Sequence, residues 1–188
     1  MGTRALRAVI ATALVLTSAA IATPTADAAP SASVVPSPNQ LDYSMHRGVD
    51  CVTQNYCWAV GSWTHTDGRT LVEHWDGTAW KIVPSPNADW ATDSHLTAVS
   101  CVSSTDCMAV GDASTLSSYD LDAPIDPLFL HWDGSTWTVA PGSRNGPKSF
   151  ISPRGAARTP LLRGVSCTKN MCFAVGDRDG KTLVVRYR

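Results

Sequence analysis

The sequence predicts an all-β protein that resembles a β-propeller, with three four-stranded antiparallel blades. The first observation is a cysteine-containing unit that occurs three times, at residues 48–61, 98–111 and 164–176. The second is a His-Trp-Asp-Gly-x-x-Trp box that follows the first two copies, at residues 74–80 and 131–137. Self-similarity at a period of about 50 residues is typical of propellers and related repeat arrays.

Each unit reads as a four-stranded meander, which the second copy shows most clearly. Short segments of strand-like pattern alternate there with turn-rich residues such as Ser103-Ser104-Thr105-Asp106. The expected strands cover residues 95–101, 107–112, 128–132 and 137–140. Asp133-Gly134 predicts a hairpin turn between the last two, because glycine readily takes positive φ.

The first copy predicts strands near residues 48–51, 57–62, 71–75 and 80–84, and the third near 162–167, 172–177 and 183–187. A fourth strand is missing from the third copy, whereas residues 34–39 (VVPSPN) match the exit of the first copy at 83–87 (VPSPN). We therefore expect blades at about 41–87, 90–141 and 160–188, with strand 34–39 completing the last one. Completion in cis gives a compact monomer, and completion in trans gives a six-bladed homodimer.

The N-terminal residues 1–28 read as a secretory signal peptide. Arg4 and Arg7 precede an apolar stretch at 8–22, and Ala26-Asp27-Ala28 is a small-x-small cleavage site. The alternative is an N-terminal membrane anchor, although the apolar stretch is short for one. Cleavage predicts a secreted repeat domain at 29–188 that has no membrane contact.

The charge of residues 29–188 argues against a nucleic-acid partner. Removing Arg4, Arg7 and Asp27 from 15 basic and 16 acidic residues leaves 13 and 15, a net charge of −2. An electrostatic nucleic-acid binder would carry a basic patch.

The six cysteines form three local pairs, and an even count behind an export signal predicts disulfides. The pairs are Cys51 with Cys57, Cys101 with Cys107, and Cys167 with Cys172. Zinc is the alternative, but two of the three spacings are wider than the usual C-x2-4-C and no histidine pairs follow at finger spacing. We therefore expect disulfides, and neither a metal nor another cofactor.

The cysteine hairpin, the Ala-Val-Gly that follows it and the His-Trp-Asp-Gly-x-x-Trp box resemble repeats of secreted actinobacterial proteins, over residues 34–188. Those repeats are similar to β-propellers of the Kelch and Asp-box groups. Asp76-Gly77 lacks one residue that the Asp-box has between these positions, and the double glycine of Kelch is absent. The resemblance implies a fold, an extracellular setting and a structural role for the box, and it implies no activity.

Aromatic and polar residues that recur between copies are expected to build the fold rather than a site. The recurring aromatic residues are Trp75, Trp132 and Tyr187 on the third strands, and Trp80 and Trp137 on the fourth. We expect them in the core between blades, with a sugar-binding platform as the alternative. His74, His131 and Arg186 recur one residue earlier and are expected to be satisfied polar residues.

Residues that occur once, in loops, are the better candidates for binding, because ligand contacts concentrate in loops on a rigid scaffold. The candidates are Trp63 and His65 in the loop at 63–69, Trp90 in the linker at 87–95, and Tyr119, Asp120 and Asp122 in the loop at 113–127. Asp120, Asp122 and Asp126 predict a solvated acidic loop, with a calcium site as the alternative.

Three functional hypotheses from different classes follow. The first is a non-catalytic binding module for a glycan or another cell-surface ligand. The second is a glycoside-acting enzyme, for which Glu73 is the weak catalytic candidate because it is the only glutamate. The third is an interaction protein with no small-molecule site. An exposed strand residue is the alternative reading of Glu73. The sequence favours the binding module over the enzyme.

Overall fold

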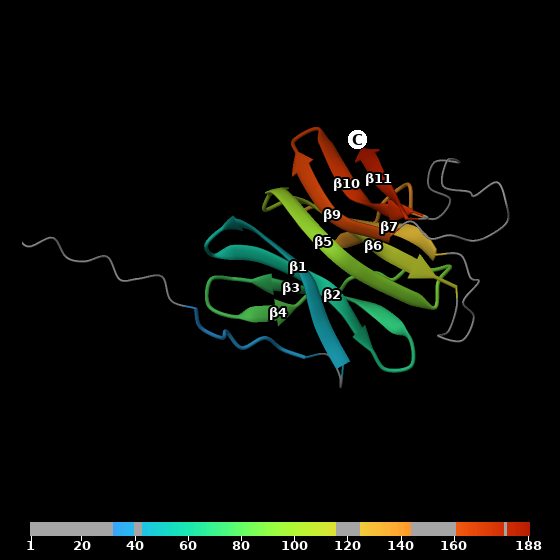
Figure 1. Cartoon of the computed structure of the whole chain (residues 1–188). Coiled ribbons are helices and arrows are strands. Elements are labelled where there is room, and N and C mark those ends of the chain that lie inside the picture. The colour runs from blue at the N-terminus through green and yellow to red at the C-terminus, as the bar shows by residue number, and fades with distance from the viewer. Residues whose placement is uncertain (1–31, 40–42, 116–124, 144–160, 179) are drawn as a thin grey trace, which may run out of the picture. The chain divides into compact units, whose positions relative to one another are not determined.

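The computed structural model describes residues 32–39, 43–115, 125–143, 161–178 and 180–188. Its regular structure there is entirely β, in three antiparallel sheets within the compact unit Val35–Arg188 (Figure 1). The first sheet contains β1 (Tyr43–Thr53), β2 (Tyr56–Thr64), β3 (Gly68–Trp75) and β4 (Trp80–Ile82). The second contains β5 (Asp93–Ser103), β6 (Asp106–Ser114), β7 (Ile125–Trp132) and β8 (Trp137–Val139). The third contains β9 (Leu161–Thr168), β10 (Met171–Arg178) and β11 (Lys181–Tyr187).

The predicted all-β meanders are confirmed, but the strands are longer and the loops shorter than expected. Trp63 belongs to β2 and Asp126 to β7, so the expected loops at 63–69 and 113–127 both begin or end inside strands. Asp126 lies opposite Ala113 in the ladder, so this aspartate is not part of an acidic loop. Polar and apolar residues mix at the strand ends, and cross-strand hydrogen bonding there overrides the turn-like composition.

The segment at 34–39 does not complete the third sheet in this structure, which corrects the expectation of closure in cis. Residues 32–39 form no strand, and the Ser37 hydroxyl donates to Glu73 Oε2 on β3 of the first sheet, at 2.7 Å. Pro36 and Pro38 have no N–H for a ladder, so this segment is a poor strand by itself. The described sheets are open, and β11 is an edge strand of the third.

The three disulfides pair as predicted, each within one hairpin. Cys51–Cys57, Cys101–Cys107 and Cys167–Cys172 each join residues directly opposite one another, with Cα atoms 4.0 Å apart. No cysteine is free. Each short hairpin therefore carries a covalent link across its own turn.

The aspartates of the two boxes organise tight turns, as the resemblance implies. Asp133 Oδ1 accepts hydrogen bonds from the Ser135 and Thr136 N–H groups at 2.8 Å, and Asp76 Oδ1 does the same for Thr78 and Ala79. The bonds from Thr136 and then Ser135 lower the pKa of the Asp133 carboxyl to about 2. The glycine that follows each aspartate has positive φ, 93° and 96°. The boxes are therefore structural turns.

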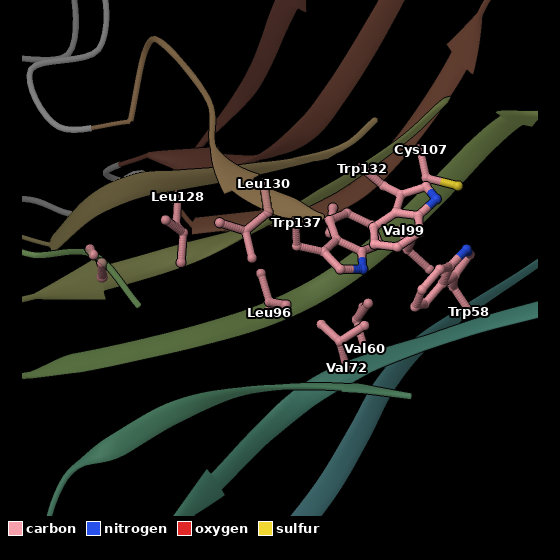
Figure 2. Close-up of a cluster of buried hydrophobic side chains, with 13 residues drawn as sticks. Trp58, Val60, Val72, Leu96, Val99, Cys107, Leu128, Leu130, Trp132 and Trp137 are labelled. Atoms are coloured by element: carbon pink, nitrogen blue, oxygen red, sulfur yellow. The ribbon is translucent and has the colours of Figure 1, made fainter. Parts of the chain in front are cut away.

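Consecutive sheets pack face to face, and the core lies between them. We call the face that holds Trp58, Val60 and Val72 the forward face of the first sheet. It packs against what we call the backward face of the second sheet, as Figure 2 shows. The backward-face residues are Leu96, Val99, Leu128, Leu130, Trp132 and Trp137.

The second interface repeats the first. The forward face of the second sheet (Met108, Val110 and Phe129) packs against Leu162 and Ala174 of the third sheet. Tyr187 stacks on Phe129, with ring centroids 5.8 Å apart.

The expected core role of the recurring aromatics is confirmed for Trp132 and Trp137, which are 8% and 4% exposed. Their rings lie 4.8 and 5.3 Å from Trp58. Trp75 and Trp80 are half-buried and pack on each other at 5.7 Å, because they stand on the backward face of the first sheet. The same residue types are thus buried or half-exposed according to which sheet covers them.

The glycine of each Ala-Val-Gly is required by a close approach of two strands. A Cβ atom at Gly61, Gly111 or Gly176 would stand 1.9 Å from a carbonyl oxygen of the first strand in the same sheet. Real Cβ atoms essentially never come within 3.0 Å of another heavy atom. The recurrence of this glycine therefore has a steric cause.

Candidate functional site

The antiparallel order of the strands sorts the connections to two ends of the sheets. The disulfide hairpins lie at one end. The β2–β3, β6–β7 and β10–β11 connections lie at the other, which we call the loop rim. The singular loops picked out in the sequence are therefore at one rim of the scaffold.

The first strand of every sheet carries a β-bulge close to the loop rim. The ladder skips one residue between His46 and Gly48 in β1, and one between Leu96 and Ala98 in β5. It likewise skips the residue between Leu162 and Gly164 in β9. The skipped residues are Arg47, Thr97 and Arg163. Bulges redirect side chains and are frequent beside functional sites.

The three bulge residues line one hollow of about 240 Å³. Its wall is completed by residues from β5, β6 and β9, and the full lining is Arg47, His95, Thr97, Asp112, Leu161, Leu162 and Arg163. All three sheets contribute, because β5 packs against both β1 and β9. The same bulge thus delivers a polar side chain from each sheet to one place.

Hydrogen bonds fix two of the bulge residues. Thr97 Oγ1 lies 2.6 Å from the Leu162 carbonyl oxygen and 3.0 Å from that of Val110, so it links the second and third sheets. Arg163 Nε donates to Asp177 Oδ1 at 2.8 Å, which leaves its two NH2 groups as further donors. The floor of the hollow is therefore held in place before any ligand arrives.

His95 is positioned by the β2–β3 connection of the first sheet. A Cβ atom at Gly68 would stand 2.3 Å from His95 Cε1, so the ring lies directly against the Gly68 backbone. The Gly68 N–H donates to Asp93 Oδ1, and His95 Nδ1 is buried without a hydrogen-bond partner among the described residues. A buried polar atom without a partner is uncommon in folded proteins.

Asp112 is the acidic group of the hollow. Burial raises the pKa of its carboxyl, the nearby charges of His95 and Arg47 oppose that rise, and Asp93 adds to it. This carboxyl therefore holds its proton to a higher pH than an exposed aspartate does. The hollow offers guanidinium donors together with a carboxyl and an imidazole, which suits a small polar ligand rich in hydroxyl groups.

Of the expected ligand-binding residues, the structure brings two to the loop rim. Trp63 is half-buried near the end of β2, and His65 is exposed in the connection that follows. Trp90 is half-buried and packs against the core between the first two sheets, so it contributes to packing. Tyr119, Asp120 and Asp122 lie outside the described residues.

Glu73 is not an exposed strand residue, which corrects the alternative reading of the sequence. Its side chain is 0% exposed, and its carboxylate contacts the Ser37 hydroxyl at 2.7 Å and His46 Nε2 at 3.5 Å. The equivalent positions in the other sheets hold Leu130 and Val185. Glu73 therefore makes polar contacts with Ser37 and His46 at a position that is apolar in the other two sheets. Glu73 is not among the residues that line the hollow.

His74 and His131 differ although their positions recur. His131 Nε2 lies 3.0 Å from Asp106 Oδ1, which confirms the expectation of a satisfied polar residue. His74 packs between Tyr56 and Trp58, and its buried Nε2 has no hydrogen-bond partner among the described residues. Burial accordingly lowers the pKa of the His74 imidazole.

Sequence reasoning missed Arg47, His95, Asp112 and Arg163. The signal was present, because Arg47, Thr97 and Arg163 each stand one residue before the recurring Gly/Ala-Val-x-Cys. Three polar residues at one repeat position look like ordinary surface positions until the bulge turns them toward a common hollow.

No three His, Cys, Asp or Glu side chains group as metal ligands among the described residues. Over the same residues, no helix is long and apolar enough to cross a membrane. Three disulfides are typical of extracellular proteins.

No family model matches the chain, and no curated protein does. Among solved structures, the chain is similar to one recorded as "YCF48 bound to D1 peptide", with 14% sequence identity and a TM-score of 0.43. The match covers 80% of this chain and 46% of that chain, so this chain spans less than half of its length. Similarity at this level assigns no partner or activity to the chain.

Proposed function

We propose that the protein is a secreted, non-catalytic binding module that takes a carbohydrate into the hollow at the loop rim. The observation that carries the proposal is the thrice-repeated bulge, which delivers Arg47, Thr97 and Arg163 from three sheets to one concave polar site. Ligand sites are typically concave and lined by a few convergent polar groups. The signal-like N-terminus and the disulfides support the extracellular setting.

A carbohydrate suits this site better than a purely anionic ligand. The two arginines are balanced by Asp112 within the hollow and by Asp177 beside it, so the site mixes donors and acceptors. Sugar hydroxyls both donate and accept hydrogen bonds, which such a mixture can satisfy. Our proposed binding surface includes two more residues at the same rim. The Trp63 ring offers an aromatic face to the sugar, and His65 offers a polar contact.

The three sheets are, in this proposal, blades of a propeller-like array, as the resemblance to secreted actinobacterial repeat proteins implies. The regular packing of forward face on backward face supports this reading. The loop rim then corresponds to one face of the array, where singular loops present the ligand site.

A glycan array followed by calorimetry on the chain from Ala29 tests the proposal. We expect a saccharide ligand whose affinity falls at least tenfold in Arg47→Ala and in Arg163→Ala, since each loses a charge-assisted hydrogen bond of roughly 1.5–3 kcal/mol. Lys81→Ala is the matched control, because this exposed cation pairs with Asp76 away from the hollow. Absence of any glycan ligand, or equal loss of affinity in all three variants, contradicts the proposal.

A further inference from the structure

The forward face of the third sheet is an exposed apolar surface. Phe173, Val175 and Val184 are 42%, 47% and 64% exposed, and Val175 is paired directly with Val184 across β10 and β11. Counted from the recurring Ala-Val-Gly, these residues are equivalent to Trp58, Val60 and Val72 of the first sheet. In the second sheet their equivalents are Met108, Val110 and Phe129.

The same face is buried in both other sheets, and the structure shows what buries it. Trp58 is 1% exposed and Val110 is 0% exposed, because each packs against the backward face of the sheet that follows. Two observed interfaces thus define the partner of a forward face in this chain. That partner is the backward face of an equivalent sheet.

The first sheet presents the matching backward face. Val49 is 63% exposed there, whereas its equivalent in the second sheet, Val99, is 6% exposed. Trp75 and Trp80 are half-buried, at the positions where the second sheet has the buried pair Trp132 and Trp137. In the observed interface Trp58, the equivalent of Phe173, packs against Trp132 and Trp137.

A set of hydrogen bonds between Thr70, Ser85 and Asn87 in the first sheet, which we call the polar clasp, is a second feature that relates the first sheet to the third. Thr70 N donates to Asn87 Oδ1 at 2.9 Å, and Thr70 Oγ1 lies 2.8 Å from Ser85 Oγ. These bonds hold the exit segment 83–87 (VPSPN) along β3, and Val83 N donates to the Val72 carbonyl oxygen at 2.9 Å. Thr70 is 5% exposed as a result.

The third sheet has a threonine at the position of Thr70, but among the described residues no segment like 83–87 lies beside it. Thr182 is equivalent to Thr70 by its register with Asp177, and it is exposed. Residues 35–39 repeat the letters VPSPN, so Ser37 and Asn39 are the counterparts of Ser85 and Asn87. The second sheet has Pro127 at the threonine position and a different exit sequence, so the match is specific to the first and third sheets.

We propose that the third sheet docks a second copy of this chain, whose first sheet packs on Phe173, Val175 and Val184 and whose segment 34–39 lies along β11 as segment 83–87 lies along β3. Ser37 and Asn39 of that copy then clasp Thr182, as Ser85 and Asn87 clasp Thr70. Ser37 leaves Glu73 in this exchange, which uncovers the backward face for docking. The contact is head-to-tail, and two such contacts close a ring when the rotation permits.

Light scattering on the chain from Ala29, across a concentration series, tests the proposal. We expect twice the mass of one chain, and the mass of one chain for Val184→Asp and for Val175→Asp. Both valines are exposed within one copy, so these variants should keep the native circular dichroism spectrum. Thr138→Asp is the matched control, because Thr138 is an exposed strand residue on β8, and it should keep the doubled mass.

The clasp is tested by Thr182→Val, which should raise the dissociation constant of the dimer at least tenfold, whereas Thr138→Val should leave it unchanged. A native chain with the mass of one copy at every concentration overturns the proposal. A doubled mass that survives both valine-to-aspartate substitutions overturns it as well. If neither valine-to-aspartate variant folds, the mass of Phe173→Ser in solution tests the same contact with a smaller change of polarity.

Discussion

Replacing Gly111 by alanine tests the packing logic of the repeat. The new Cβ would stand 1.9 Å from the His95 carbonyl oxygen and 2.8 Å from Leu96 Cα. Ordinary contact begins at 3.4 Å, and both obstacles are backbone atoms of β5 that no rotamer change can move. Overpacking costs about 1–3 kcal/mol, and we expect the upper end, about 3 kcal/mol, because a paired strand must shift.

The assay is thermal unfolding followed by circular dichroism and tryptophan fluorescence. At about 2–4 °C per kcal/mol for a domain of this size, Gly111→Ala should lower Tm by about 6–12 °C. Thr138→Ala is the control, because Thr138 is an exposed strand residue on β8, outside the proposed contact between copies. It should change the stability by less than about 0.5 kcal/mol. Equal melting temperatures for the two variants would show that β5 and β6 accept a Cβ atom at position 111 without strain.

Three further predictions concern the core, the disulfides and pH. Trp58→Ala should cost about 3–5 kcal/mol in urea unfolding, because this side chain is 1% exposed between two sheets; a cost below 1 kcal/mol would contradict the assigned core. The double variant Cys101→Ala, Cys107→Ala should lose about 2 kcal/mol, since the bridge closes a short loop; an unfolded protein would assign the bridge a larger role. Burial lowers the pKa of His74 below its ordinary 6.5, so the unfolded chain binds a proton more readily. Stability should therefore fall as pH drops through about 6.5, and His74→Phe should weaken that dependence in melting curves from pH 5 to 8.

The repeat in the sequence predicted the sheets and disulfides because those features are local. Cys101 and Cys107 oppose each other across one turn, and the alternation beside them needs no knowledge of other sheets. The burial of Trp132 was predictable for a different reason, because an aromatic residue recurs at its position in every copy and recurrence marks residues that build the fold. Tertiary context was required to learn that Trp75 is half-exposed at the end of the array.

The candidate site was largely hidden from sequence reasoning. Arg47 and Arg163 are far apart in the chain, and only the bulges and the packing of β1, β5 and β9 bring them together. Glu73 looked like an exposed strand residue, because nothing in its own strand indicates that Ser37 and His46 contact its carboxylate. A two-residue period reports which face a side chain occupies, and it does not report what covers that face.

In our proposal, the exposed forward face of the third sheet in one copy packs against the backward face of the first sheet in another copy. The most direct measurement mixes two variants, Ser37→Cys and Thr182→Cys, under oxidising conditions. Ser85 and Thr70, their equivalents, have side-chain oxygens 2.8 Å apart, a separation compatible with a disulfide. Docking between copies should give a covalent heterodimer on non-reducing gels of the mixture and little covalent dimer in either variant alone. A mixture that stays monomeric, while the double variant forms the bridge within one chain, would contradict it.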